Sequence, residues 1–222
     1  MQQFVIDIET SGTPFEEMDE ETQQYLLKRA DTPEKIQEVK ERLNLWALTG
    51  EIVTIGVFDV ASKSGTAFFQ APGKEIAAFD EDNFHYEPGT EQECLERFWK
   101  MIAKADRVIT FNGRAFDMPW LLTRSLVRGV RATRNIMPPR YSTSFHVDLA
   151  DLLAFYGATR HYALSFWCKM LNIESSKGDI SGAEVPEAYR RGEYERIARY
   201  CMQDVRATAE LFERWYVAIG QL

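Results

Sequence analysis

Phe4-Val-Ile-Asp-Ile-Glu9 is the stretch that decides the fold, because it is apolar on both faces apart from Asp7 and Glu9. A strand with two apolar faces is typical of the interior of a sheet that helices cover on both sides. Side chains alternate along a strand, so Asp7 and Glu9 point to the same side. Unpaired charges lose their hydration when buried. Taken alone, the pair fits either a cation site or a strand end that is paired with lysine or arginine at the surface.

Further strands and helices follow along the chain. Residues 14–48 are charged and helix-like, and Thr32-Pro33-Glu34 is a good helix start. This order predicts an α/β fold, with a mixed sheet flanked by helices and a single domain over residues 1–222. We expect a helical insertion at approximately residues 14–50, between the first two strands. The other predicted elements are strands at 51–60, 65–70 and 107–111, a strand running into a helix at 145–156, and helices at 90–104, 117–128, 164–171 and 193–219.

A second candidate motif is the segment from Thr110 to Leu121, which contains Asn112, Phe116 and Asp117. A predicted buried strand ends there in an Asn-Gly turn, and the next predicted helix opens with Asp117. An aspartate in that place often serves only as an N-cap that accepts hydrogen bonds from the first turn. The segment alone leaves both a functional and a capping role open.

A third candidate motif, Tyr200-Cys-Met-Gln-Asp204, lies on the last predicted helix. Positions four apart share a helix face, so the phenol and the carboxylate point the same way. Asp204 also falls on an apolar stripe, where an aspartate is out of place. A buried tyrosine bonded to an aspartate in a structural network would explain the same pattern. The stripe consists of Ile197, Cys201, Asp204, Thr208, Leu211 and Trp215.

Together, the three motifs resemble those of the DEDD 3′→5′ exonuclease superfamily, which has an RNase H-like fold. The matching pieces are Asp7-Ile8-Glu9, Asn112 to Asp117, and Tyr200 with Asp204. A sister branch has histidine where this chain has Arg199, so the chain resembles the tyrosine (DEDDy) branch. The second motif is similar to that of the proofreading domain of family-B DNA polymerases, as are Tyr162-Ala-Leu and Lys177-Gly-Asp-Ile180. The chain resembles a free-standing relative of that domain.

The resemblance implies that Asp7, Glu9, Asp117 and Asp204 hold two Mg²⁺ or Mn²⁺ ions, a role that suits carboxylate oxygens. It implies that Tyr200 positions the attacking water. The expected reaction is metal-dependent 3′→5′ hydrolysis from the end of single-stranded DNA. A 3′→5′ exoribonuclease of the same superfamily remains an alternative, as does a catalytically silent module that binds nucleic acid.

The resemblance also suggests residues that bind the substrate. Thr10, Ser11 and Gly12 follow the first motif, where the family's backbone approaches the terminal nucleotide, although a simple turn fits the same residues. Asn112 and Phe116 are candidates for contacts with the terminal sugar or base. Phe116 fits a core position equally well.

The net charge of −8 argues against a protein that coats nucleic acid non-specifically. An arginine-rich stretch without acidic residues nevertheless lies between Asp117 and Asp148. It fits either a track for substrate phosphates or a solvated surface. Arg160 and Lys177 are weaker candidates of the same kind. The arginines of the stretch are Arg124, Arg128, Arg131, Arg134 and Arg140.

Three cysteines without a C-x-x-C pair indicate a reduced cytoplasmic protein without structural zinc. No run of residues approaches the roughly 20 apolar residues of a membrane span, and the first residues lack the pattern of a signal peptide. We expect a nucleic acid partner and no membrane. Any replication or repair partner, and the oligomeric state, lie beyond what the sequence specifies.

Overall fold

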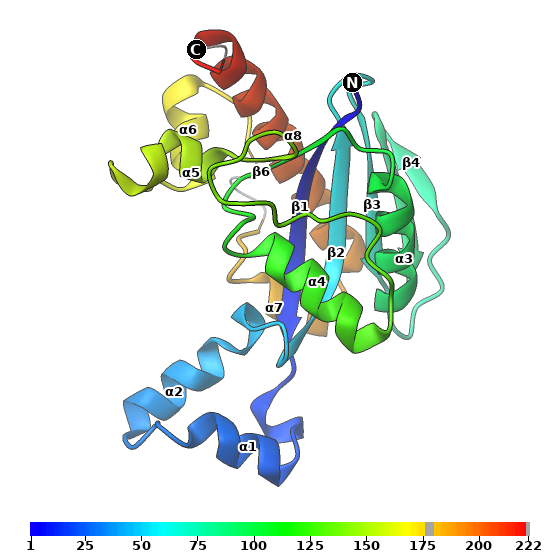
Figure 1. The fold of residues 1–222 in the computed structure, drawn as a ribbon. Helices are drawn as coiled ribbons and strands as arrows, with labels where there is room; N and C mark the ends of the chain where they lie inside the picture. Colours follow the sequence, from blue (N-terminus) through cyan, green and yellow to red (C-terminus); the bar gives the residue numbers. More distant parts are fainter. Residues whose placement is uncertain (176–179, 221–222) are drawn as a thin grey trace.

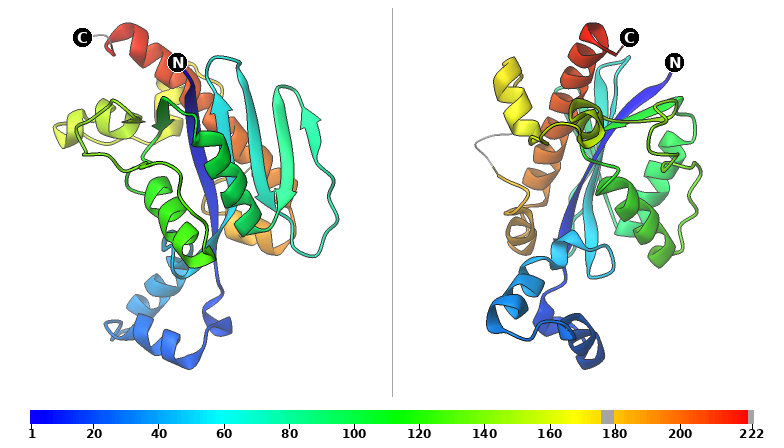
Figure 2. Two further views of the ribbon diagram at one scale, coloured as in Figure 1. Left: turned by 45° about the vertical axis from the view of Figure 1, so that its right-hand side comes forward. Right: turned by 60° about the vertical axis from the view of Figure 1, so that its left-hand side comes forward.

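The computed structural model, which describes residues 1–175 and 180–220, is built around a mixed seven-stranded sheet (Figure 1). The strand order is β4-β5-β3-β2-β1-β6-β7. Helices lie on both faces of this sheet, as Figure 2 shows, so the predicted α/β fold is confirmed. The strands are β1 (Gln3–Gly12), β2 (Gly50–Asp59), β3 (Ser64–Gln70), β4 (Phe79–Glu81), β5 (Phe84–Gly89), β6 (Arg107–Thr110) and β7 (His146–Asp148).

Strand β1 lies inside the sheet, antiparallel to β2 and parallel to β6. Its two faces enter different cores, as the sequence predicts. Phe4, Ile6 and Ile8 pack into the core that also contains the buried side chains of α3 and α4, whereas Val5 packs into the core shared with α8. Alternation therefore directs Asp7 to the α8 side of the sheet.

The helices are divided between the two faces of the sheet. Helices α3 and α4 pack on one face, and the long helix α8 crosses β1, β2 and β3 on the other. Thr90 begins α3 with a reciprocal capping box to Glu93. The helices outside the insertion are α3 (Glu91–Ile102), α4 (Asp117–Arg128), α5 (Leu149–Leu153), η3 (Phe155–Gly157), α6 (Leu164–Leu171), α7 (Val185–Arg190) and α8 (Tyr194–Ala218).

The predicted insertion between β1 and β2 is helical and projects beyond the end of these strands (Figures 1 and 2). Thr32 caps its second α-helix, with proline in the first turn, as the sequence predicts. Neither of its α-helices has a buried residue. The insertion is tied to the sheet where the Thr10 hydroxyl donates to the Asn44 carbonyl at 2.8 Å. Its elements are η1 (Phe15–Glu17), α1 (Glu20–Leu27), α2 (Pro33–Glu41) and η2 (Leu43–Leu45).

Three short elements, β4, β5 and α7, are absent from the sequence prediction. Strand β5 includes Pro88, and helix α7 has only six residues, so neither shows a clear periodic pattern. The predicted boundaries of the longer elements agree with the structure within one or two residues, except that β1 continues three residues beyond the predicted end at Glu9. Of the helices in the described part of the chain, none is long and apolar enough to cross a membrane.

Candidate active site

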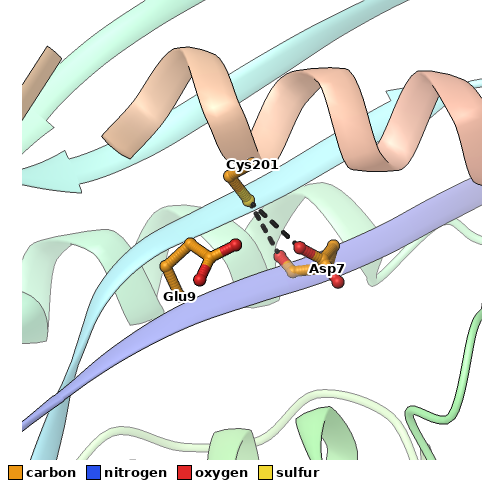
Figure 3. Close-up of side chains that lie close together, drawn as sticks. All are labelled: Asp7, Glu9 and Cys201. Atoms are coloured by element: carbon orange, nitrogen blue, oxygen red, sulfur yellow. Dashed lines mark hydrogen bonds between the residues drawn. The ribbon is translucent and has the colours of Figure 1, made fainter. Parts of the chain in front are cut away.

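Asp7 and Glu9 lie on β1 on the side that faces α8 (Figure 3). Asp7 is half-buried and Glu9 is 7% exposed. One ligand atom from each of these residues and from Cys201 lies within 4.8 Å of the other two. Two carboxylates thus converge at the interior surface of α8, as strand alternation predicts.

Asp117 approaches the same site from the first residue of α4. Its Oδ1 accepts a hydrogen bond from the Ile8 backbone nitrogen at 3.0 Å, between the two acidic residues of β1. The N-cap of α4 is Phe116, so Asp117 does not serve as the cap. The side chain joins α4 to β1 and is 4% exposed. This bond explains why a carboxylate is buried at this point of the fold.

Asp204 and Tyr200 enter the site from α8. The Tyr200 hydroxyl donates to the Asp204 carboxylate, and both residues are half-buried. Their four-residue spacing places them on one face of the helix. The predicted pairing of phenol and carboxylate is therefore present in the fold, next to Asp7 and Glu9.

The four carboxylates interact electrostatically. Burial raises the pKa of Asp7 well above its usual range, and repulsion from Asp117, Glu9 and Asp204 raises it further. The pKa of Glu9 is raised by burial first and then by Asp204 and Asp117. Burial raises the pKa of Asp117 to about 7. The ionised forms of these carboxylates are therefore disfavoured, and a bound cation would stabilise them.

The donor set fits divalent cations of the Mg²⁺ class. Among the described residues, neither lysine nor arginine contributes to the raised pKa values of Asp7 and Glu9. Carboxylate oxygens are the hard ligands that Mg²⁺ and Mn²⁺ prefer. The site is thus acidic and largely buried, and within residues 1–175 and 180–220 no cationic side chain neutralises its two β1 carboxylates. Divalent cations are stabilised in such an environment.

Cys201 is a site residue that sequence reasoning missed. Its thiol donates to the Asp7 carboxylate Oδ2 and to the Asp7 carbonyl, both at 3.6 Å. Gly56 lies opposite Asp7 in the β1–β2 register, and a Cβ there would stand 2.8 Å from the Cys201 sulfur. The absence of a side chain at Gly56 makes room for the thiol. Only the position of Cys201 between Tyr200 and Asp204 could have signalled this role.

Asp148 is a second residue that the sequence interpretation did not single out. It ends β7, and its carboxylate accepts hydrogen bonds from the backbone nitrogens of Asn112 and Arg114, each at 2.8 Å. Asn112 has a left-handed backbone (φ 64°), so the turn is sharply bent. Asp148 thereby fixes the turn that leads to Asp117. The signal available was an aspartate directly after a short apolar strand.

Thr10, Ser11 and Gly12 extend β1 rather than forming the alternative turn. The Thr10 hydroxyl is bonded to the insertion, and Ser11 is 3% exposed. At Gly12, a Cβ would stand 2.6 Å from the Asn44 nitrogen, so the residue allows close approach of the insertion backbone. The structure explains these small residues by packing, and their contact with a nucleotide stays a prediction.

Asn112 and Phe116 differ in their exposure. Asn112 is exposed at the tip of the turn, whereas Phe116 is half-buried with its ring 5.8 Å from that of Trp120. Phe116 also packs against the core beneath α3 and α4. The prediction that Phe116 packs against the core is therefore confirmed. A substrate contact of Asn112 or Phe116 stays a prediction.

Most of the arginine-rich stretch contacts the protein itself. Arg124 is 6% exposed and forms a bidentate pair with Glu91, so a solvated or phosphate-tracking role for it is wrong. Arg128 pairs with the same carboxylate. Arg134 donates to the Ala105 carbonyl, and Arg140 pairs with Asp151. Arg131 and Arg160 are exposed, and Lys177 lies outside the described residues.

Several proteins that are similar to this chain in sequence or in fold are DNA polymerases. The chain is 32% identical to a DNA polymerase of Desulfurococcus sp. (strain Tok) and 30% identical to one of Thermococcus gorgonarius, each over 149 residues. These matches cover 60% of this chain and 19% of each relative, so the chain spans about a fifth of their length. The structure of the family B DNA polymerase from Pyrobaculum calidifontis is similar in fold, with a TM-score of 0.62 and 18% identity over 97% of this chain and 24% of that one.

A family match covers most of the chain, including the turn, Asp117, Tyr200 and Asp204. Residues 70–222 match the family described as a predicted 3′-5′ exonuclease related to the exonuclease domain of PolB. The insertion and β1 precede the matched region. With the carboxylates of β1 brought to those of α4 and α8 by the same fold, the chain belongs to this family of PolB-like 3′-5′ exonuclease domains.

Proposed function

We propose that the protein is a metal-dependent 3′→5′ exonuclease that removes nucleotides from the end of single-stranded DNA. The observation that supports this proposal is the gathering of carboxylates from β1, α4 and α8, in which the pKa values of Asp7, Glu9 and Asp117 are raised and, among the described residues, no lysine or arginine neutralises Asp7 and Glu9. Such a group is costly without a ligand cation. The membership of the PolB-like family supports the same activity.

In this proposal, Asp7, Glu9, Asp117 and Asp204 hold two Mg²⁺ or Mn²⁺ ions. When bound, the ions supply an activated water and charge stabilisation at the leaving 3′-oxygen. The hydrogen bond from Ile8 fixes the orientation of Asp117, and Cys201 fixes that of Asp7. Positioning of this kind keeps the ligand oxygens where the ions require them.

Tyr200 acts as a hydrogen-bonding group rather than as a base. Burial raises the pKa of its phenol, and the charges of Glu9, Asp204 and Asp7 raise it further. The hydroxyl therefore stays protonated at neutral pH, and it orients the attacking water from its place beside Asp204. Cations held by the four carboxylates would lower the pKa of that water, so that Tyr200 would not have to accept its proton.

DNA is the proposed substrate because the relatives similar in sequence are DNA polymerases. RNA has the same phosphodiester chemistry at this site, and only contacts with the 2′-hydroxyl would separate the two. We propose that a protein of DNA replication or repair is the partner of this chain.

Digestion of 5′-labelled single strands tests the proposal. DNA and RNA of one sequence are incubated with Mg²⁺, Mn²⁺ or EDTA, and the products are separated by length. We expect a descending ladder on DNA that requires the metal and is lost in Asp7→Ala. Asp31→Ala, at an exposed position in the insertion, is the matched control. A ladder that persists in Asp7→Ala or in EDTA would contradict the proposal, and a ladder on RNA alone would reassign the substrate.

A further inference from the structure

Helix α6 and the loop before it carry aromatic side chains that are partly exposed in the described part of the chain. The rings of Tyr162 and Phe166 are stacked, with centroids 5.0 Å apart and an interplanar angle of 17°. Tyr162 is 41% exposed and Phe166 is 44% exposed. Met170, four residues further along the same face, is 61% exposed. This outward stripe contrasts with the inner face of α6, where Cys168 is buried in the core.

A cation completes the stack. The Arg160 guanidinium lies over the Tyr162 ring, 5.4 Å from its centroid. Three flat groups, one guanidinium and two rings, therefore follow one another on the surface. We refer to Arg160, Tyr162 and Phe166 as the stacking surface. Alternating cationic and aromatic groups of this kind hold the phosphates and bases of single-stranded nucleic acid.

The charge around the stacking surface also favours nucleic acid. Residues 152–173 contain no aspartate or glutamate, although the whole chain has 34 acidic residues and a net charge of −8. The same segment contains Arg160, His161 and Lys169. The flanking Asp151 and Glu174 are paired with Arg140 and Arg206, so a phosphate chain would meet less repulsion along this segment.

The segment that contains the stacking surface interacts at both of its ends with elements that also carry residues of the carboxylate site. At one end, Tyr156 interacts electrostatically with Arg114 of the turn that leads to Asp117. At the other end, Glu174 pairs with Arg206 of α8 at 3.3 Å. Helix α6 itself packs against α8 (Figure 1). The stacking surface therefore lies on a segment that packs against α8, the helix that carries Tyr200 and Asp204.

We propose that the stacking surface binds upstream nucleotides of a single strand while its 3′ end occupies the carboxylate site. This inference rests on the proposed exonuclease function and extends it to residues outside the metal site. The bases stack on Tyr162 and Phe166, and Arg160 contacts a phosphate. Such contacts do not depend on base identity, because every base has a flat face.

Binding of fluorescent dT20 in EDTA, measured by anisotropy, tests the surface separately from hydrolysis. We expect Tyr162→Ala and Phe166→Ala each to raise the Kd about ten-fold. Arg160→Ala lowers the slope of log Kd against log salt by about 0.7, the value for one lost phosphate contact on a single strand. Tyr25→Ala, which removes a 77% exposed ring on the insertion, leaves the Kd unchanged.

Hydrolysis in Mn²⁺ provides the second readout. In the proposed arrangement a dinucleotide has no upstream nucleotides to place on the stacking surface, so the ring variants keep wild-type kinetics on it and show a raised KM on dT20 with little change in kcat. A wild-type protein that binds dT20 through these rings but hydrolyses neither substrate would refute the exonuclease function and leave this surface standing. Ring variants that bind dT20 as tightly as wild type, or that change only the oligomeric state, would overturn the inference.

Discussion

Two buried groups of charged side chains lie in this molecule, and they are built in opposite ways. At Glu91, two guanidinium groups face one carboxylate: Arg124 at 2.8 Å and Arg128 at 2.5 Å. Burial raises the pKa of Glu91, but the hydrogen bonds from Arg124, Ile52 and Arg128 outweigh burial and lower it. At the candidate active site, by contrast, carboxylates face one another. The Glu91 carboxylate is fully compensated by guanidinium groups of the protein itself, whereas the carboxylates of the candidate active site require a cation from outside the protein.

The difference separates a structural cluster from a functional one. The Glu91 cluster joins α3, α4 and, through the bond from Arg124 to the Ala47 carbonyl, the end of the insertion. The Glu91 carboxylate is paired and hydrogen-bonded without any ligand. The raised pKa values lead us to expect that the carboxylate group destabilises the fold in the absence of cations, as functional sites commonly do. Removal of one acidic side chain should therefore have opposite effects on stability at the two places.

Asp7→Asn gives the largest expected effect. Loss of one ligand charge lowers metal-dependent hydrolysis about a thousand-fold or more, because the bound ions supply several kcal/mol to the transition state. The same substitution relieves repulsion and raises the Tm in EDTA. Nuclease assays and thermal unfolding measure the two effects. Asp31→Asn at an exposed position is the control, and a lower Tm of Asp7→Asn in EDTA would contradict the comparison.

Glu91→Ala is expected to destabilise the protein by about 3–5 kcal/mol, since it leaves the buried Arg124 guanidinium without a carboxylate. Denaturant unfolding measures the change. Glu96→Ala, at an exposed position of the same helix, is the matched control. The folded fraction of Glu91→Ala should keep its kcat, because Glu91 pairs with arginines outside the carboxylate group. Stability equal to that of Glu96→Ala would show that the Glu91 cluster is not structural.

These two clusters also show what the sequence could predict. Asp7, Glu9, Tyr200 and Asp204 follow local rules, since strand alternation and the four-residue helix spacing fix which side chains share a face. The central strand and the insertion follow from similar local patterns. Motif resemblance then joined segments that are far apart in the chain, and no local rule could do this.

The parts that the sequence did not predict depend on long-range contacts. In the sequence, Arg124 cannot be distinguished from a surface arginine, because its partner Glu91 lies 33 residues away. The space for Cys201 depends on the register that places Gly56 opposite Asp7. Strand register and helix docking are set by the whole core rather than by any local pattern. The same holds for the short strands β4 and β5.

The stability of the metal-free protein should depend on pH through the carboxylate group. The pKa of Asp117 is raised to about 7 in the folded protein, against about 3.9 for an unfolded aspartate. Below about pH 4 the residue is protonated in both states, and its contribution to stability is full. As the pH rises towards 7, the unfolded chain releases the proton first, so the contribution is lost.

The expected loss from Asp117 between pH 4 and 7 is about 2–4 kcal/mol. Thermal unfolding in EDTA measures it as the difference between wild type and Asp117→Asn, which keeps an acceptor for the Ile8 nitrogen. Mn²⁺ should raise the Tm of wild type more at pH 7.5 than at pH 5, because protonated carboxyl groups bind the ion poorly. Parallel pH curves for wild type and variant would contradict this account.

Tyr200→Phe gives the smallest expected effect, and it separates positioning from metal binding. The substitution removes one hydroxyl that donates to Asp204 and leaves all four carboxylates in place. Loss of one hydrogen bond to the reacting water lowers kcat about ten-fold. The Mn²⁺ concentration for half-maximal activity should change little. Tyr216→Phe on the same helix is the matched control, because its 41% exposed ring lies outside the carboxylate group. If Tyr200→Phe instead weakened Mn²⁺ binding and left kcat unchanged at saturation, the phenol would belong to the support of Asp204 rather than to the positioning of water.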